Sequence, residues 1–408
     1  MTAAIVVGAT GIVGRAIVEH LLKEESISTI FCLSRKSSGQ VHTKIKHAFL
    51  DLRASGVQMA AGLSGIRAEY VYFSAYTAPS DPDEMFRVNN AMLENFLGAL
   101  EQTGAVSSIK RFILTCGLKQ YGVHLGQPKQ PMVETDLPLT AGFGGINWPA
   151  NFYYTQQSLL ERMAAKHDFE WVCTLPKDVI GHAKGNFMNP ATALGLYCAV
   201  SQALPGSELP FPGNRDNFFS FNTWTSANLH ARFCLWAATA PGAGNQIFNV
   251  VNGDVESWQS LWPRLAKRFK CTMPDAPFTT ASRGAEASRY ELKTQQPIFA
   301  YAGQLGISSD TAVAKHATID LPIDLSKWSH RPDVVKAWEA LRDEHHLDQG
   351  AWENATWGFM AMAFGREYST VASMSKARKL GWTGYEDTWD AFEETFEVLE
   401  REHILPPS

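Results

Sequence analysis

The chain has 408 residues, of which 45% are hydrophobic and 19% charged, and its formal net charge is −5. This composition is typical of a soluble globular protein with room for two domains. The negative charge argues against a nucleic acid or an anionic membrane as a partner. The six cysteines form no Cys-x-x-Cys pair, so we expect reduced thiols and no metal site. No leader or membrane-length apolar run is evident, which predicts a cytoplasmic protein.

The first predicted element is a short β-branched strand over residues 5–7, followed by a glycine-rich turn and a helix over residues 15–23. The turn has the spacing Gly-x-x-Gly-x-x-Gly. Its first glycine permits the tight turn, the second lets a pyrophosphate approach the backbone, and the third lets the helix lie close to the sheet. Because the amides at a helix start face an anion, we predict a dinucleotide site here, against the alternative of an ordinary tight turn. The predicted binding residues are Gly8, Thr10, Gly11, Ile12, Val13 and Gly14.

A second strand is predicted over residues 29–34, and it ends in Ser34, Arg35 and Lys36. A site that prefers NAD usually has an acidic residue at this position to hold the ribose hydroxyls, whereas a guanidinium can grip the oxygens of a 2′-phosphate. These three residues therefore favour NADPH as the cofactor. The alternative is a solvated basic turn, since charges after strands are common.

Further strands are predicted over residues 47–50, 69–73, 111–115, 171–175 and 246–250, with helices over 82–102 and 151–166. Strands that alternate with helices in this way predict an α/β fold with a doubly wound parallel sheet of the Rossmann type. Ligands of such sheets bind beyond the carboxyl ends of the strands. The predicted cofactor-binding residues at those ends are Asp51, Leu52, Ser74, Ala75, Tyr76 and Val179.

The sequence divides into two predicted regions. Residues 1–181 form the NADP-binding Rossmann domain, to which the strand over 246–250 returns. Residues 182–408 are mainly helical and rich in tryptophan and phenylalanine. We expect this second region to cap the sheet and to bind the substrate.

Ordinary short-chain dehydrogenases use a tyrosine and a lysine four residues later on one helix, and no tyrosine of this chain has that spacing. The helix over 151–166 offers Tyr153 and Tyr154, and Lys119 lies just past the strand over 111–115. That position faces the nicotinamide in this fold class, so Lys119 and Tyr153 are the candidate catalytic residues and are also expected to contact the cofactor. The alternatives are a solvated turn lysine and an aromatic pair that anchors a helix start.

Two motifs carry a resemblance to a known family. Residues 115–122 resemble the Thr-Gly-x-Lys-x-Tyr motif of the progesterone 5β-reductase/iridoid synthase-like enone reductases (PRISE), and residues 151–154 match their Asn-Phe-Tyr-Tyr motif. The resemblance implies an atypical extended short-chain dehydrogenase/reductase that uses NADPH to reduce a carbon–carbon double bond conjugated to a carbonyl. It also implies that Lys119 and Tyr153 are catalytic. The chain departs from the family at Cys116, at Gln120 and in the turn over residues 175–178.

Hydride delivered to the β-carbon of an enone moves negative charge onto the carbonyl oxygen. The phenol of Tyr153 can donate a hydrogen bond to that oxygen, and we expect the ammonium of Lys119 to favour the charge and to lower the pKa of Tyr153 from about 10. We expect a small apolar carbonyl-containing substrate, in a pocket to which Tyr121 and Trp357 are candidate contributors. A homodimer is compatible with the sequence.

Two other functions stay open at this point. One keeps the cofactor but reduces a carbonyl directly, or acts as an epimerase or dehydratase on a nucleotide sugar. The other is a non-catalytic regulator that binds NADP(H) without turnover.

Overall fold

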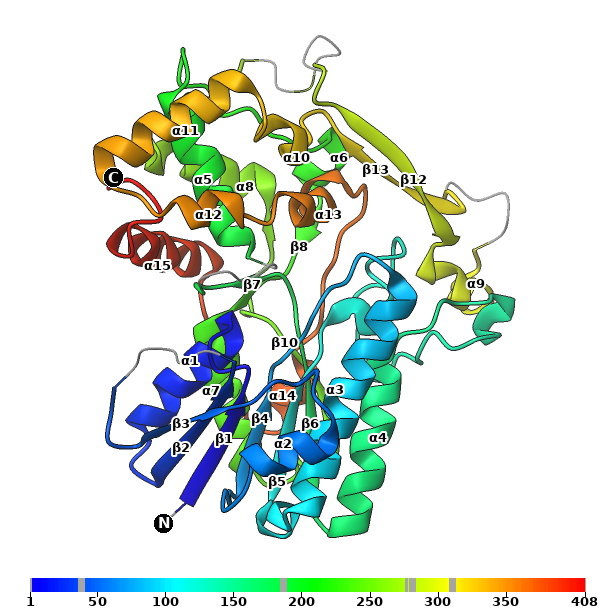
Figure 1. The fold of residues 1–408 in the computed structure, drawn as a ribbon. Helices are drawn as coiled ribbons and strands as arrows, with labels where there is room; N and C mark the ends of the chain where they lie inside the picture. Colours follow the sequence, from blue (N-terminus) through cyan, green and yellow to red (C-terminus); the bar gives the residue numbers. More distant parts are fainter. Residues whose placement is uncertain are drawn as a thin grey trace.

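The computed structural model describes residues 2–35, 41–183, 189–275, 278, 284–307 and 313–407. Its largest sheet has seven parallel strands in the order β10-β6-β5-β4-β1-β2-β3 (Figure 1). The strands are β1 (Thr2–Val7), β2 (Ile27–Ser34), β3 (Ile45–Phe49), β4 (Tyr70–Phe73), β5 (Arg111–Thr115), β6 (Glu170–Pro176) and β10 (Gln246–Val250). The predicted doubly wound Rossmann fold is confirmed.

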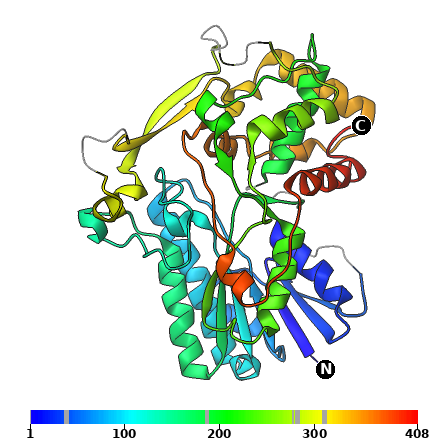
Figure 2. The ribbon, with the colours of Figure 1, turned by 180° about the vertical axis from the view of Figure 1, so that it is seen from behind.

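Helices cover both faces of this sheet (Figures 1 and 2). One face carries α1 (Ile12–Lys23) and α7 (Ala227–Thr239), and the other carries α2 (Gly56–Gly62), α3 (Pro82–Gln102) and α4 (Phe152–His167). The inner strands are nearly continuous apolar runs because both of their faces are buried, whereas the edge strand β3 is largely exposed. Ile5, Val71 and Phe112 are fully buried, for example, and belong to one core with the inner faces of the helices.

The remainder of the chain forms a cap above the carboxyl ends of the strands (Figure 1). Its longer helices are α5 (Pro190–Ala203), α8 (Trp258–Arg268), α11 (Pro332–His345) and α15 (Thr388–Arg401). Short helices are α6 (Arg215–Phe219), α9 (Ala302–Leu305), α10 (Leu325–Trp328), α12 (Gln349–Glu353) and α13 (Met360–Gly365), while α14 (Ser375–Lys379) packs by β10. The predicted helical region also contains an antiparallel pair, β12 (Ser288–Gln295) with β13 (His316–Leu321).

Short pairings join the two parts of the molecule. The strand β7 (Val179–Ile180) follows β6 in the chain and pairs with β9 (Thr225–Ser226). The strand β8 (Phe221–Asn222) pairs with β11 (Glu256–Ser257). A segment after α13 then returns from the cap to the sheet, where Met132 bridges to Ala372 (Figure 2). The cap is therefore anchored at the edge of the sheet where ligands bind.

The strand order reverses between β1 and β4, because β2 and β3 extend the sheet to one side and β5, β6 and β10 to the other. Rossmann sheets bind their ligands in the crevice at this point. Among the described residues, no helix combines the length and the apolar character needed to cross a membrane.

Candidate active site

A cleft of about 510 Å³ opens at the carboxyl ends of the strands, between the sheet and the cap. It is lined by the segments that follow β1, β2, β3, β4, β5 and β6 and by one segment of the cap. Predicted site residues that line it are Gly8, Thr10, Gly11, Ile12, Val13, Ser34, Arg35, Asp51, Leu52, Ser74, Ala75, Tyr76, Lys119, Tyr153 and Val179. The sheet thus brings residues from most of the first half of the chain into one cavity.

The glycine turn has the geometry of a phosphate cradle. Gly8 has φ +80°, and a Cβ on Gly14 would lie 2.1 Å from the carbonyl oxygen of Gly8. The missing side chain of Gly14 therefore lets α1 pack against the turn. Gly14 itself does not line the cleft. No side chain caps the start of α1 and its first turn has no acidic residue, so its amides can receive an anion. These features fit the pyrophosphate of a dinucleotide.

Two guanidinium groups lie at the β2–β3 side of the cleft. Arg35 and Arg53 are exposed and line it, and Arg53 Nη2 donates to Thr77 Oγ1 at 3.2 Å. The Arg53 amide also donates to Asp51 at 3.0 Å. Arg53 was missed by the sequence reasoning, although a cation shortly after a strand end is the same signal that selected Arg35. The third predicted member, Lys36, lies outside the described residues.

Asn151 connects the two segments that carry the candidate catalytic residues. Its side-chain oxygen accepts the N–H of Tyr153 at 3.0 Å and so caps the start of α4. Its side-chain nitrogen donates to the carbonyl oxygen of Lys119 at 2.8 Å. One asparagine therefore fixes the backbone of both Lys119 and Tyr153 at the wall of the same cleft.

The side chains of the pair have different surroundings. Lys119 Nζ donates to Tyr76 Oη at 3.2 Å and lies 5.6 Å from the centre of its ring. The Tyr153 ring is buried against Phe152, with 4.5 Å between ring centres. A Cβ on Gly117 would lie 3.3 Å from the Tyr153 hydroxyl, so the absence of a side chain there leaves room around the hydroxyl.

The structure corrects the expected effect of Lys119 on Tyr153. Burial raises the pKa of Tyr153 well above 10, and its neighbours Cys116 and Tyr76 push it in the same direction. The Lys119 ammonium is turned toward Tyr76 instead, and burial lowers the pKa of Lys119 itself. The expectation was wrong because burial penalises the phenolate of Tyr153, while the ammonium of Lys119 lies against Tyr76. Tyr153 is thus a neutral O–H donor at physiological pH.

Tyr121 and Trp357, the two predicted pocket residues, lie in the protein core and not in the lining of the cleft. Tyr121 donates its hydroxyl hydrogen to Asn249 Oδ1 at 2.8 Å. Trp357 packs against Trp328 and Trp352 in the cap. Phe359 and Met362 of the same cap segment line the cleft. The segment is helical, so side chains on one side of it face the core while those on the other side face the cleft.

The cleft also contains polar residues to which the sequence reasoning gave no role. His124 lines it beyond Lys119, and burial, with a smaller contribution from the charge of Lys119, lowers the pKa of His124 to about 3, so its ring is neutral. Lys177, Asp178 and Arg366 line the cleft on the cap side. No local pattern indicates Arg366, because only the folded cap brings it to the end of β6.

Comparisons with known proteins agree with this geometry. The family described as PRISE-like Rossmann-fold domain matches residues 51–277, and the family described as Male sterility protein matches residues 6–60. An uncharacterised protein of Schizosaccharomyces pombe is 36% identical over 99% of this chain and 98% of its own. An (S)-8-oxocitronellyl enol synthase of Nepeta racemosa is 26% identical over 99% of this chain and 93% of its own. A 3-oxo-Delta(4,5)-steroid 5-beta-reductase of Arabidopsis thaliana is 24% identical over 99% of this chain and 93% of the reductase.

Among solved structures, an epimerase of Methanothermobacter thermautotrophicus superposes with a TM-score of 0.62 at 12% identity, over 99% of this chain and 94% of that one. At this identity the likeness concerns the fold. The homologues, the family models and the glycine cradle define a nicotinamide-dependent oxidoreductase of the short-chain dehydrogenase/reductase type. Within that class, the chain belongs to the PRISE-like Rossmann-fold family.

Proposed function

We propose that this protein is an NADPH-dependent reductase that acts on the activated double bond of an enone or enal, with Lys119 and Tyr153 stabilising the enolate oxygen. The observation that carries the proposal is the link through Asn151, which holds Lys119 and Tyr153 at the wall of the cleft that contains the glycine cradle. A relative named as a 3-oxo-Delta(4,5)-steroid 5-beta-reductase supports the same chemistry.

Different residues of the cleft would bind different parts of the cofactor and the substrate. The turn over residues 8–13 would hold the pyrophosphate, and Arg35 with Arg53 would hold a 2′-phosphate, which is the basis for proposing NADPH. When bound, the cofactor supplies the hydride. The body of a small apolar carbonyl compound would lie against Phe359, Met362 and other apolar residues of the cap.

Tyr153 would act on the oxygen of the substrate. Because burial keeps its phenol neutral, it donates a hydrogen bond to the carbonyl oxygen as negative charge gathers there. Lys119 adds a positive charge on the same wall of the cleft. The α-carbon takes its proton from water, so the mechanism requires no buried base.

A substrate panel tests the proposal. NADPH oxidation, followed at about 340 nm, is measured with enals, enones and saturated ketones. We expect consumption with the conjugated compounds alone. Consumption with saturated ketones alone would indicate a carbonyl reductase, and tight NADPH binding without any turnover would indicate a regulator.

A matched pair of variants tests the role of Tyr153. Tyr153→Phe should lower kcat by about 100- to 1,000-fold, the usual effect of removing a donor aimed at a developing oxyanion, while the Kd for NADPH stays within about twofold. The control is Tyr154→Phe, because the Tyr154 hydroxyl donates to Gln120 at 2.6 Å and accepts from Leu139 at 3.0 Å. That variant should lose about 1–3 kcal/mol of stability and keep its kcat. Full activity of Tyr153→Phe would refute the proposed role.

A further inference from the structure

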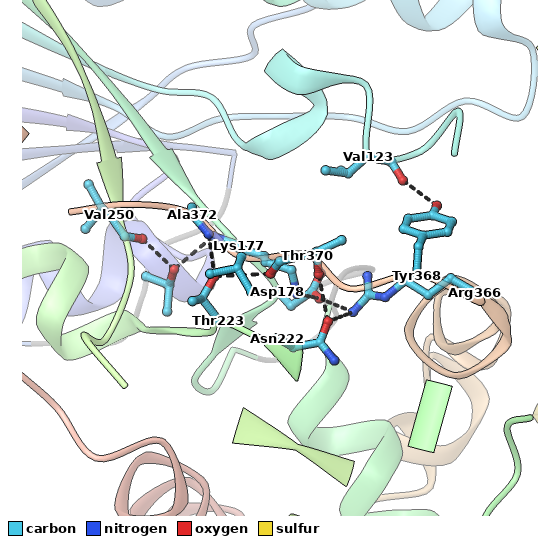
Figure 3. Close-up of polar contacts among 12 residues, drawn as sticks. Val123, Lys177, Asp178, Asn222, Thr223, Val250, Arg366, Tyr368, Thr370 and Ala372 are labelled. Carbon is cyan, nitrogen blue, oxygen red and sulfur yellow. Dashed lines mark hydrogen bonds and ion pairs between the residues drawn. The ribbon is translucent and has the colours of Figure 1, made fainter. Parts of the chain in front are cut away.

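Three charged side chains from distant parts of the chain meet on the cap side of the cleft (Figure 3). Lys177 and Asp178 follow β6, and Arg366 follows α13. Lys177 Nζ lies 2.6 Å from Asp178 Oδ2, and Arg366 Nη2 lies 3.6 Å from the same oxygen. The lysine and arginine side chains are only 3% and 5% exposed, yet all three residues line the cleft.

The charges of this cluster do not balance. Two cations share one carboxylate, which leaves one positive charge. Lys177 is the nearer partner of Asp178, so it neutralises most of that carboxylate. Arg366 is bonded through Nη2 to the neutral amide oxygen of Asn222 at 2.8 Å, and its Nε has no hydrogen-bond partner among the described residues. Burying a cation away from water has a large desolvation free energy unless an anion compensates its charge.

The pKa values of the cluster agree with this assignment. Burial pushes the pKa of Asp178 upward, but Lys177 and Arg366 outweigh it and leave that pKa below the usual value. Burial lowers the pKa of Lys177 to about 8, with Asp178 acting against that change and Arg366 adding to it. Near neutral pH the cluster is therefore a carboxylate with two cations.

The cluster is separate from the cofactor's own anion sites. The glycine cradle follows β1 and the two arginines follow β2 and β3, whereas Lys177 follows β6. Three strand spacings separate β6 from β1 in the sheet, which is about 14 Å. The backbone directly before the cluster, at Pro176, does lie beside Tyr153. The carbonyl oxygen of Pro176 lies 3.4 Å from the point where a Cβ on Gly117 would be, and the Tyr153 hydroxyl lies 3.3 Å from the same point.

We propose that the substrate carries a carboxylate in addition to its conjugated carbonyl, and that Arg366 binds this carboxylate while Lys177 neutralises Asp178. The inference rests on the proposed reductase function, because it places the reacting end of the same molecule at Lys119 and Tyr153. A single uncompensated charge matches a carboxylate better than the double charge of a phosphate. Arg366 is thus a determinant of substrate class at the cap wall.

A set of matched substrates tests this inference on the unmodified protein. The probes are a linear enal with a carboxylate at its far end, the methyl ester of the same molecule, and the analogue with a phosphate in place of the carboxylate. We expect kcat/KM for the acid to exceed that for the ester by at least about 30-fold, in the range expected for one charge-assisted contact. Equal rates with acid and ester would overturn the inference, and a preference for the phosphate would overturn the choice of carboxylate.

Two variants change the acid-to-ester ratio in opposite directions. Arg366→Gln should bring the ratio close to one, whereas Asp178→Asn should raise it, because the cluster gains a positive charge. Asp178 has φ +40°, a conformation that asparagine tolerates. Arg264→Gln is the control, since Arg264 is exposed on α8 and lies over Trp389. If Arg366 and Asp178 had only a structural role, their variants would affect acid and ester equally.

A binding measurement separates this inference from the reductase proposal. Calorimetry with the saturated carboxy-aldehyde and its methyl ester, in the presence of NADP⁺, needs no turnover. Tighter binding of the acid without reduction of any enal would refute the reductase function and support the anion site. Reduction of both enals with equal binding of acid and ester would support the reductase function and refute the anion site.

Discussion

The two parts of the molecule bury different kinds of side chain. The core of the Rossmann half is built largely from aliphatic residues on parallel strands, such as Ile5, Val6 and Val71. In the cap, seven of the twelve tryptophans are buried in one core. Trp338 and Trp352 stack there with 5.1 Å between ring centres. The sheet therefore fixes strand ends in a regular register, whereas large rings determine where the cap segments lie.

This difference bears on how the candidate site is divided. The cradle follows β1 and Lys119 follows β5, so the register of the sheet sets their positions. Tyr153 lies in the first turn of α4, which Asn151 ties to Lys119. Phe359, Met362 and Arg366 come from a cap segment that packs on Trp258 through Phe364. Under the proposed function, one half of the chain would supply the reaction and the other would select the substrate.

The largest expected effect comes from the cap core. Trp262 is fully buried, and its indole N–H donates to Leu209 at 3.0 Å. Trp262→Ala should lower stability by about 3–5 kcal/mol, measured by chemical denaturation. We expect a higher KM for the substrate and a Kd for NADPH within about threefold, because the cradle lies in the other core. Phe112→Ala serves as the matched variant in the sheet, where Phe112 packs against Phe73 and Phe96. It should raise both the KM for the substrate and the Kd for NADPH. Loss of NADPH binding in Trp262→Ala would show that the two cores depend on each other.

A smaller effect is expected at the cofactor side of the Rossmann half. Arg35→Ala should raise the KM for NADPH by about 10- to 100-fold, the range for one hydrogen bond between charged groups, and should hardly change the KM for NADH. Arg67→Ala is the control, because Arg67 bonds to the carbonyl oxygens of Ile66 and Thr103 and does not line the cleft. Equal changes for the two cofactors would remove the argument for a 2′-phosphate.

The smallest expected effect is a pH dependence of the cap wall. As pH rises through about 8, Lys177 loses its proton. Asp178 then has Arg366 as its only charged partner in the cluster, and the cation available to a substrate carboxylate is lost. The acid-to-ester ratio of kcat/KM should therefore fall by several-fold between about pH 7 and about pH 9, while the ester's own KM stays level. A ratio that rises with pH would contradict this assignment.

The sequence predicted the Rossmann half well because its signals are local. A β-branched run, three glycines and a helical repeat describe one strand–turn–helix unit, and every predicted sheet strand matches a strand of the structure within a few residues. The Asn-Phe-Tyr-Tyr stretch was informative for the same reason. Asn151 caps its own helix, which is a local feature, whereas its hydrogen bond to Lys119 joins residues 32 positions apart and depends on the fold.

Other features depended on contacts between distant segments. Tyr121 and Trp357 have the side chains that a pocket uses, but side-chain type does not tell which face of a segment meets the core. The pKa of Tyr153 depended on burial, which only packing determines. The meeting of Lys177, Asp178 and Arg366 joins residues 188 positions apart.

The sequence by itself determined the fold class and the cradle, because parallel strands bring their carboxyl ends to one edge of a sheet. Its two family motifs pointed to the proposed catalytic pair. The tertiary structure alone decided the direction in which the pKa of Tyr153 shifts and the composition of the cap wall. Those properties follow from desolvation and from the packing of aromatic side chains, and both arise only when distant segments exclude water together.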